Sequence, residues 1–227
     1  MITDLSTDRV VCLQLHLGGD RNFHYLLGDR GSGRVAAIDP GFAAGRFAAA
    51  AASRGLTIGA ILITHGHGDH TGAAAELATI SGAPVHAGRA DAVPGARALA
   101  DDEVIAAGGV GITALRTPGH APDHYCFHAA PFLVTGDLLF CGKVGGTGPG
   151  FPGSSPGQQW DSLQRVLQLP DETIVLPGHD YYGGQGDRPR STIGLERREN
   201  PFLAGDYAAF RHLKATWATY KKEQGIR

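Results

Sequence analysis

One short segment constrains this chain more than any other. Residues 64–70 read Thr-His-Gly-His-Gly-Asp-His, so three of the eleven histidines lie within six residues of one another. Side chains two apart in an extended segment point the same way, and His65 and His67 can therefore bind one metal ion together. The two glycines let the chain turn tightly, which directs Asp69 and His70 toward a second position nearby. Imidazole and carboxylate groups are the ligands expected for zinc, iron or manganese.

Three further segments each place one ligand-type residue just after a predicted strand. Their motifs are Thr-Pro-Gly-His ending at His120, Thr-Gly-Asp ending at Asp137, and Pro-Gly-His-Asp around His179. A lone Gly-Asp or Gly-His is ordinarily a turn-forming or hydrogen-bonding group, but four coordinated placements favour a shared site. Proteins of the α/β class commonly place their chemistry at such strand ends. We therefore predict one metal site built from these loops.

The hydrophobic pattern predicts a chain of mixed strands and helices. Strands are predicted over residues 10–17, 23–27, 35–38, 59–64, 84–87, 111–116, 123–127, 132–135 and 173–176, the first three as an antiparallel meander. Helices are predicted over residues 42–54, 71–80, 158–168, 191–199 and 206–223. Residues 89–99 are expected to be a weak helix or a loop. Residues 142–157 form a long loop rich in Gly, Pro and Ser, which is typical of a functional or disordered segment.

Composition excludes several classes of protein. A length of 227 residues suits one domain, and a net charge of −2 indicates no basic surface for nucleic acid. The basic residues that gather at 188–198 and 211–222 are typical of solvated helix surface. Three cysteines, Cys12, Cys126 and Cys141, argue against a disulfide framework and favour a reducing cytoplasm. The polar N-terminus does not resemble a signal peptide, and no apolar run approaches the ~20 residues that span a membrane.

The ordered set His-x-His-x-Asp-His, then His, Asp and His, resembles the metallo-β-lactamase superfamily over nearly the whole chain. The resemblance implies an α/β fold, the αβ/βα sandwich, in which two mixed β-sheets are flanked by helices. It implies a single domain over residues 1–227, with a short helical extension at about 190–227. By matching positions, the resemblance assigns the first metal to His65, His67 and His120, the second to Asp69, His70 and His179, and the bridge to Asp137.

The resemblance also implies a mechanism and its cofactors. Two divalent metal ions are expected, with zinc favoured over iron or manganese. Metals ~3.5–4 Å apart share a bridging hydroxide, which serves as the nucleophile at neutral pH, and they polarise the substrate oxygen. Asp69 is placed both to hold a metal and to orient that hydroxide, so we predict that it is catalytic as well as a ligand.

The C-terminal half resembles glyoxalase II, the hydroxyacylglutathione hydrolases, and their single-domain bacterial relatives. The shared motifs are Cys-Gly-Lys at 141–143, Gly-His-Asp-Tyr at 178–181, Ser-Thr-Ile-Gly at 191–194, Asn-Pro-Phe-Leu at 200–203 and Arg-x-x-Lys at 211–214. This resemblance implies hydrolysis of a thioester or a related ester, and a glutathione pocket lined by Lys143, Tyr181, Arg211 and Lys214. Cations suit the carboxylates of the tripeptide, and a phenol donates a hydrogen bond. The alternative is a mobile loop lysine at Lys143 and plain helix surface at Arg211 and Lys214.

Other branches of the superfamily differ at identifiable positions. Aspartate in place of cysteine at the bridging position disfavours β-lactam hydrolysis. Persulfide dioxygenases share all seven ligand types but use one iron, bound by matches to His65, His120 and Asp137, and they typically have arginine where this chain has Phe202. Lactonases often have a tyrosine near the position of Phe140. A mononuclear iron persulfide dioxygenase and a lactonase are therefore the alternative functions.

Two residues near the predicted site have no assigned role. His124 either orients a metal ligand or is a strand residue with a satisfied hydrogen bond. Cys141 is expected to be a buried, unreactive thiol. The expected partner is a small-molecule thioester or ester, glutathione-derived in the leading hypothesis. A non-enzymatic metal-binding protein is the remaining class, and it would not need seven ligands around an open site.

Overall fold

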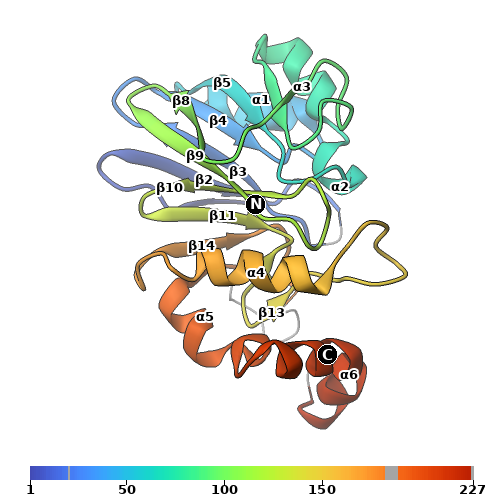
Figure 1. Ribbon diagram of the computed structural model, residues 1–227. Helices are drawn as coiled ribbons and strands as arrows, with labels where there is room; N and C mark the ends of the chain where they lie inside the picture. The colour runs from blue at the N-terminus through green and yellow to red at the C-terminus, as the bar shows by residue number, and fades with distance from the viewer. Residues whose placement is uncertain (20, 182–188, 226–227) are drawn as a thin grey trace.

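Two β-sheets lie face to face in this computed structural model, which describes residues 1–19, 21–181 and 189–225 (Figure 1). The first sheet has the order β1 (Ile2–Asp4), β2 (Val10–Leu15), β3 (His24–Asp29), β4 (Arg34–Ile38), β5 (Thr57–Leu62), β6 (Val85–Ala87) and β7 (Arg97–Ala98). The second has the order β15 (Ser191–Thr192), β14 (Ile174–Pro177), β11 (Phe132–Gly136), β10 (Tyr125–Ala129), β9 (Val110–Arg116) and β8 (Glu103–Ala107). A separate ribbon pairs β12 (Leu139–Phe140) with β13 (Lys143–Val144).

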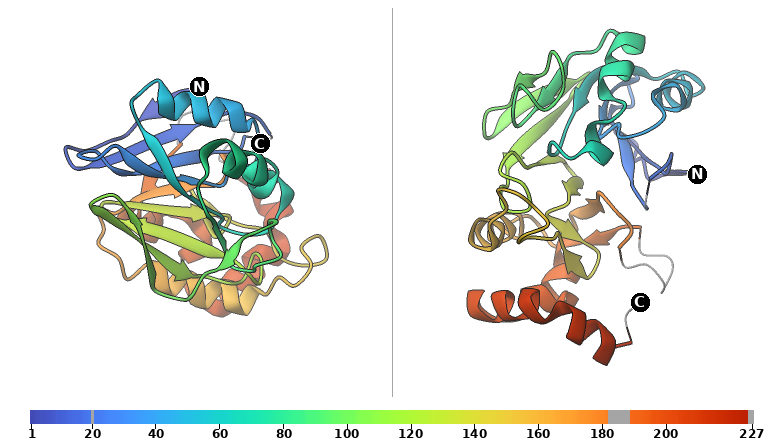
Figure 2. Two further views of the ribbon diagram at one scale, coloured as in Figure 1. Left: turned by 90° about the horizontal axis from the view of Figure 1, so that it is seen from above. Right: turned by 90° about the vertical axis from the view of Figure 1, so that its right-hand side faces the viewer.

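The helices cover the outer faces of both sheets. They are α1 (Ala44–Ala52), α2 (Gly68–Thr71), α3 (Ala74–Ser81), α4 (Pro156–Val166), α5 (Ile193–Glu199), the 3-10 turn η1 (Pro201–Leu203) and α6 (Tyr207–Glu223). Phe47 of α1 and Leu77 of α3 pack on the first sheet, while Leu163 of α4 and Phe210 of α6 pack beneath the second. The layers are separate in the side view of Figure 2. Among the described helices, none combines the length and apolar character that membrane crossing requires.

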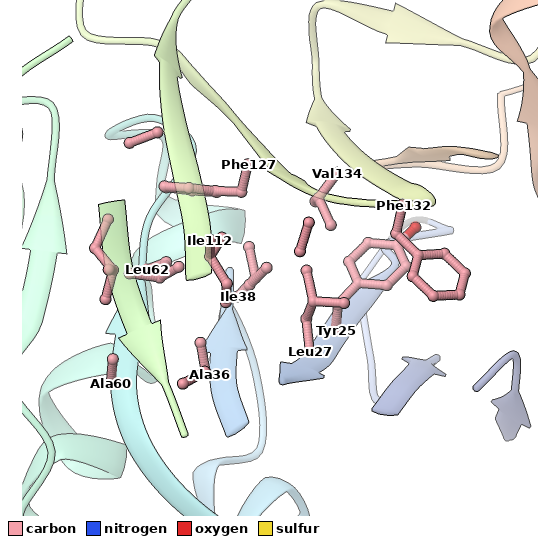
Figure 3. Close-up of a cluster of buried hydrophobic side chains, with 14 of the residues drawn as sticks. Tyr25, Leu27, Ala36, Ile38, Ala60, Leu62, Ile112, Phe127, Phe132 and Val134 are labelled. Atoms are coloured by element: carbon pink, nitrogen blue, oxygen red, sulfur yellow. The ribbon is translucent and has the colours of Figure 1, made fainter. Parts of the chain in front are cut away.

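Alternation along the strands builds the core between the sheets. In β3, Tyr25 and Leu27 face the second sheet, whereas Leu26 between them faces the helices. Their partners across the interface include Phe127 and Phe132, which are fully buried (Figure 3). Burying each such side chain contributes roughly 1.5–3 kcal/mol. Two mixed sheets with helices on both outer faces confirm the predicted αβ/βα sandwich, and the first strands form the predicted meander.

Strand direction brings the predicted ligand loops to one edge of the sandwich. In the first sheet, β4 and β5 are parallel. In the second, β11 and β14 are parallel, and β9 runs the same way because β10 is antiparallel to both β9 and β11. Backbone hydrogen bonds from Tyr125 N to Thr64 O (2.7 Å) and from Phe23 N to Gly178 O (2.8 Å) join the sheets at this edge. The carboxyl ends of five strands therefore converge on one place.

The structure differs from the predicted elements mainly at sheet edges. The pattern did not predict β1, which has three residues and buries none fully, or β8, whose sequence Glu-Val-Ile-Ala-Ala has no polar residues between its buried ones. The predicted helix over 191–199 begins two residues later, since Ser191 and Thr192 pair with β14 and Thr192 caps the helix by accepting from Leu195 N. Residues 89–99 form turns and the two-residue strand β7. Within the predicted loop 142–157, only β13 and the start of α4 are regular apart from an isolated bridge.

Candidate metal centre

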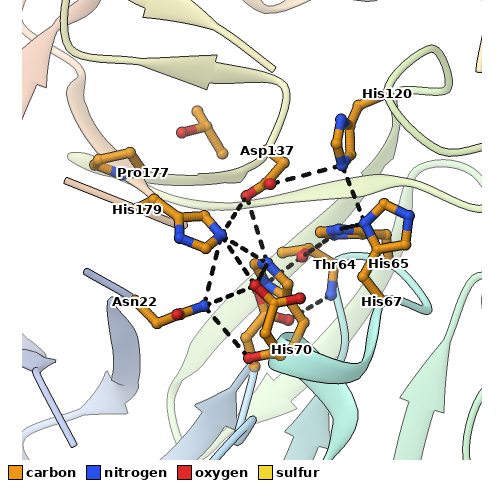
Figure 4. A network of polar contacts seen from close by, with 12 residues as sticks. Asn22, Thr64, His65, His67, His70, His120, Asp137, Pro177 and His179 are labelled. Atoms are coloured by element: carbon orange, nitrogen blue, oxygen red, sulfur yellow. Dashed lines mark hydrogen bonds and ion pairs between the residues drawn. The ribbon is translucent and has the colours of Figure 1, made fainter. Parts of the chain in front are cut away.

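The loop after β5 and the turn after β9 bring three imidazoles together (Figure 4). His67 Nδ1 lies 2.9 Å from His65 Nε2 and 3.2 Å from His120 Nε2. A tetrahedral ion with metal–nitrogen bonds of ~2.0–2.1 Å holds neighbouring ligand nitrogens ~3.3 Å apart. The three nitrogens therefore have the spacing of ligands to one ion, which we call the first cluster.

Asp69, His70 and His179 form a second cluster beside the first. Asp69 and His70 lie on the single turn of α2, and His179 follows β14. His70 Nε2 lies 3.3 Å from His179 Nε2, and Asp69 Oδ2 lies 3.2 Å from His179 Nε2 and 3.6 Å from His70 Nε2. The turn is pressed against Gly41, where a Cβ atom would lie 1.7 Å from the Asp69 carbonyl oxygen. Only glycine at that position lets α2 approach so closely.

The carboxylate of Asp137 lies between the two clusters. Its Oδ1 is 3.4 Å from His70 Nε2 and 3.5 Å from His179 Nε2, while its Oδ2 is 3.6 Å from His120 Nε2. Oδ1 is buried and has no hydrogen-bond partner within the described ranges. Buried oxygens are ordinarily satisfied, so an orphaned carboxylate oxygen facing ring nitrogens fits a cation between them. The donor set therefore fits two divalent metal ions.

Asp39 orients two of the histidines, and the sequence did not identify it. Its Oδ2 accepts hydrogen bonds from His70 Nδ1 (2.8 Å) and Thr64 Oγ1 (2.7 Å), and its Oδ1 accepts from Thr64 N (2.7 Å). Thr64 Oγ1 in turn accepts from His65 Nδ1 (3.0 Å). With both Nδ1 atoms protonated, both Nε2 lone pairs point into the centre. One signal was available: Asp39 follows β4 on a Pro-Gly turn, as the predicted ligands follow their strands.

His120 and His124 are fixed by contacts on the other side of the centre. His120 Nδ1 donates to the Gly146 carbonyl oxygen at 2.8 Å, which leaves Nε2 for the first cluster. His124 is fully buried, accepts from Asp137 N (3.2 Å) and donates from Nδ1 to Thr117 Oγ1 (2.9 Å). Burial lowers the pKa of His124 well below its usual range, so the ring is neutral. Of its two interpretations, contact with the Asp137 backbone favours the role of orienting a ligand.

Asn22 is a second residue that sequence reasoning missed. It is buried, and its Nδ2 donates to Asp69 Oδ2 at 3.0 Å. It precedes β3 and pairs with His179 as an isolated bridge. No motif marks it, because its partners lie 47 and 157 residues away in the chain.

The electrostatics of the centre favour a cation. Burial lowers the pKa of His70, but the carboxylates of Asp137 and Asp39 outweigh it and raise the value to about 9. Burial raises the pKa of Asp69, but its hydrogen bond with His179 and the charge of His70 hold it well below the usual range. Asp69 thus remains ionised, and without a metal a proton on His70 supplies positive charge to the centre.

A pocket of about 310 Å³ opens directly on the centre at His120 and Asp137. Lys143, Tyr181 and Lys214 all line it, together with an aromatic wall that includes Phe202. Lys143 Nζ lies 4.7 Å from the centroid of the Tyr181 ring, which stacks on His179 with ring centroids 4.5 Å apart. Three of the four predicted substrate-binding residues are therefore beside the centre.

Arg211 lies apart from the other three predicted substrate-binding residues. It is exposed on α6 and does not line the described pocket. Its guanidinium lies 5.8 Å from the ring of Tyr207, one helical turn earlier, and Tyr207 is also outside the pocket lining. The prediction that Arg211 binds substrate is therefore not supported by its position.

Comparison with known proteins agrees with the fold. The family model described as the metallo-beta-lactamase superfamily matches residues 18–179. The chain belongs to the metallo-β-lactamase superfamily, and its fold, donor set and relatives define a metallohydrolase.

The curated relatives support the glyoxalase II-like branch. The chain is 35% identical over 226 residues to a hydroxyacylglutathione hydrolase from Rhodospirillum rubrum, covering 84% of this chain and 85% of that protein. It is 38% identical over 171 residues to one from Fuscovulum blasticum, but this match covers only 64% of that relative and 72% of this chain.

Two solved structures are also similar. ETHE1 from Myxococcus xanthus superimposes with a TM-score of 0.81 at 31% identity, covering 91% of this chain and 90% of that one. TTHA1623, solved in a di-iron-bound form, has a TM-score of 0.71 at 33% identity, covering 84% of this chain and 99% of that one.

Proposed function

We propose that this protein is a binuclear metallohydrolase that cleaves a thioester, or a related ester, derived from glutathione. The observation that carries the proposal is the placement of Asp137, whose two carboxylate oxygens face two separate ligand clusters. The second cluster would give a second ion its own ligands, whereas the mononuclear alternative would leave those ligands without a metal. The hydroxyacylglutathione hydrolases among the relatives support the substrate class.

The seven predicted ligands would hold the two ions in the arrangement of the clusters. The first ion would be held by His65, His67 and His120 and the second by Asp69, His70 and His179, with Asp137 available to both. Bound divalent ions lower the pKa of water toward ~7 and polarise an acyl oxygen. We propose zinc, and the di-iron form of TTHA1623 makes iron the first alternative to measure, followed by manganese.

Asp69 is the group best placed to handle a proton. Its side chain is 39% exposed, against 1–9% for His70, His179 and Asp137, so it is the carboxylate that an incoming water can reach. Asn22 holds Oδ2 on the side of His179, and Oδ1 has no hydrogen-bond partner in the part of the chain that the structure describes. Its low pKa keeps it ionised, and Oδ1 can orient the attacking water by accepting a hydrogen bond from it.

The pocket residues are proposed to bind the rest of the substrate. Lys143 is half-buried, and its ammonium can pair with a carboxylate of the tripeptide. Tyr181 places a phenol beside the same pocket, next to His179. Cys12, Cys126 and Cys141 are buried thiols, and they suit the reducing cytoplasm in which we propose the enzyme works.

Metal content and turnover on one sample test the proposal. Protein purified without oxygen should contain two metal ions per chain and hydrolyse S-lactoylglutathione. Two ions without turnover would move the substrate to another ester, including a lactone. One iron, with oxygen uptake on glutathione persulfide and no hydrolysis, would refute the proposal in favour of the mononuclear persulfide dioxygenase.

A further inference from the structure

Lys214, on the C-terminal helix α6, points into the interior of the site. Its Nζ donates to the Gly145 carbonyl oxygen at 2.7 Å and to Gln159 Oε1 at 2.6 Å. We infer that Lys214 is a positioning residue for the metal ligand His120, and that its ammonium holds the pocket loop instead of binding a substrate carboxylate. This inference rests on the proposed role of His120 as a ligand.

The first route from Lys214 to His120 passes through the loop at Gly145 and Gly146. Gln159 Nε2 donates to the same Gly145 oxygen at 3.0 Å, so two side chains hold this one carbonyl. The next carbonyl, that of Gly146, accepts from His120 Nδ1 and thereby directs Nε2 to the first cluster. A Cβ atom at Gly145 would lie 1.8 Å from the Asp137 carbonyl oxygen and 3.1 Å from His120 Nδ1. The loop therefore packs between the ligands Asp137 and His120, and the hydrogen bonds from Lys214 and Gln159 fix it in place.

The second route passes through helix α4 to the backbone of His120. A Cβ atom at Gly119 would lie 2.3 Å from Gln159 Cα, so the turn before His120 rests directly on α4. Ser162 Oγ donates to the Pro118 carbonyl oxygen at 2.7 Å and fastens the same turn. Gln159 is fully buried between this turn and the pocket loop, and Lys214 covers its oxygen. Lys214 therefore supports the ring of His120 through the loop at Gly145 and the backbone of His120 through Gln159.

The two pocket lysines are used differently. An ammonium has three N–H donors, and Lys214 donates two of them to protein oxygens. Burial and the charge of Lys143 lower the pKa of Lys214 to about 7, which makes it a weak partner for a substrate anion near neutral pH. Lys143 lies over the Tyr181 ring, and within the described residues its ammonium makes no hydrogen bond. Lys143 is therefore the matched control for Lys214.

The roles of the two lysines can be distinguished by comparing the variants Lys214→Met and Lys143→Met. Zinc affinity is measured on metal-free protein by competition with a chromophoric chelator, and kcat and KM are measured on the reloaded enzymes. Lys214→Met should lose about tenfold in affinity for one zinc ion, the lower end for residues that orient a ligand, and should lower kcat. Lys143→Met should keep wild-type zinc affinity and raise KM. Wild-type zinc affinity with a raised KM in Lys214→Met would overturn the inference.

A second variant protects the test against simple misfolding. Gln159 lies outside the pocket lining, so Gln159→Leu removes the connection without touching substrate. It should lose zinc affinity in the same direction as Lys214→Met, whereas wild-type affinity in a folded Gln159→Leu protein would contradict the positioning role. Lys214→Arg, which keeps charge and donors, should restore part of the affinity. A wild-type protein that binds two zinc ions but cleaves no thioester would refute the proposed substrate and leave this inference intact, whereas one that binds no metal would overturn both.

Discussion

Replacing Asp39 by asparagine isolates the contribution of a residue that touches no metal. The carboxylate accepts three hydrogen bonds, two from Thr64 and one from His70 Nδ1. An amide of the same shape offers one acceptor oxygen and one donor group. In either orientation, a donor of the amide therefore faces a donor of Thr64 or His70. The least costly relief is for the neutral form of His70, the form that binds a metal, to carry its proton on Nε2, where it points into the centre.

The expected loss follows from this conflict. A proton on His70 Nε2 must be removed before that nitrogen can bind a metal, and losing a partner that orients a ligand typically costs 10–100-fold in metal affinity. That range corresponds to about 1.4–2.8 kcal/mol. If the proton stays on Nδ1, a buried donor is left unsatisfied instead, which costs about 1–3 kcal/mol of folding stability. Either way, the sum of the two losses should be measurable.

Chelator competition for zinc and urea unfolding of the metal-free protein measure the two losses separately. Asp29→Asn is the matched control, because Asp29 also accepts hydrogen bonds from backbone N–H groups but lies at an exposed turn away from the centre. It should leave zinc affinity unchanged. Asp39→Asn with wild-type zinc affinity and wild-type stability would refute the account of Asp39 as the group that fixes the His70 tautomer.

Three further predictions use the same centre. Asp137→Ala should lower metal content from two ions per chain to one or fewer and reduce kcat by at least about 100-fold, because both clusters lose an oxygen; elemental analysis that still finds two ions, with full activity, would contradict the bridge. His124→Phe should cost about 1–3 kcal/mol in urea unfolding, since Asp137 N and Thr117 lose their buried partner, and an unchanged midpoint would show that the contact is dispensable. The metal-free protein should lose stability as the pH falls from 6.5 to about 4, because burial lowers the pKa of His24 to about 4 and the unfolded chain binds that proton first. Above pH 6.5 His24 makes its full contribution to the free energy of unfolding, about 3 kcal/mol at ~1.4 kcal/mol per pKa unit. A urea midpoint that does not change over this pH range would refute the prediction.

The ligands could be predicted from sequence because each one sits in a local motif. Spacing within residues 64–70, and a Gly or Pro beside His120, Asp137 and His179, are visible without any fold. Asp39 also follows a strand beside a Pro-Gly turn, but it was not identified, because a single aspartate in a turn is ordinarily a turn-forming residue. The superfamily resemblance then supplied the sandwich, which hydrophobic alternation alone leaves open between several α/β arrangements.

Two residues that support the ligands, Asn22 and Gln159, could not be predicted, and the reason is sequence separation. Asn22 reaches Asp69 across 47 residues, and Gln159 reaches Lys214 across 55. Such pairs leave no periodic trace, because neither side chain belongs to a repeating pattern or a turn motif. Lys214 illustrates the consequence: its type and helix position suggest a substrate contact, and only its two acceptors indicate a different role.

Each cluster takes its ligands from both sheets, so metal binding should stabilise the fold. The first cluster takes His65 and His67 from the edge of the first sheet and His120 from the second. The second cluster divides in the same way, with His179 contributed by the second sheet. An ion in either cluster therefore links the two sheets at the edge where their inner core ends. Because the unfolded chain cannot present such a site, each bound ion should stabilise the folded state by mass action, about 2.7 kcal/mol at a free concentration of 100 times Kd. The stabilisation should be lost in variants such as Asp137→Ala that remove a ligand shared by both clusters.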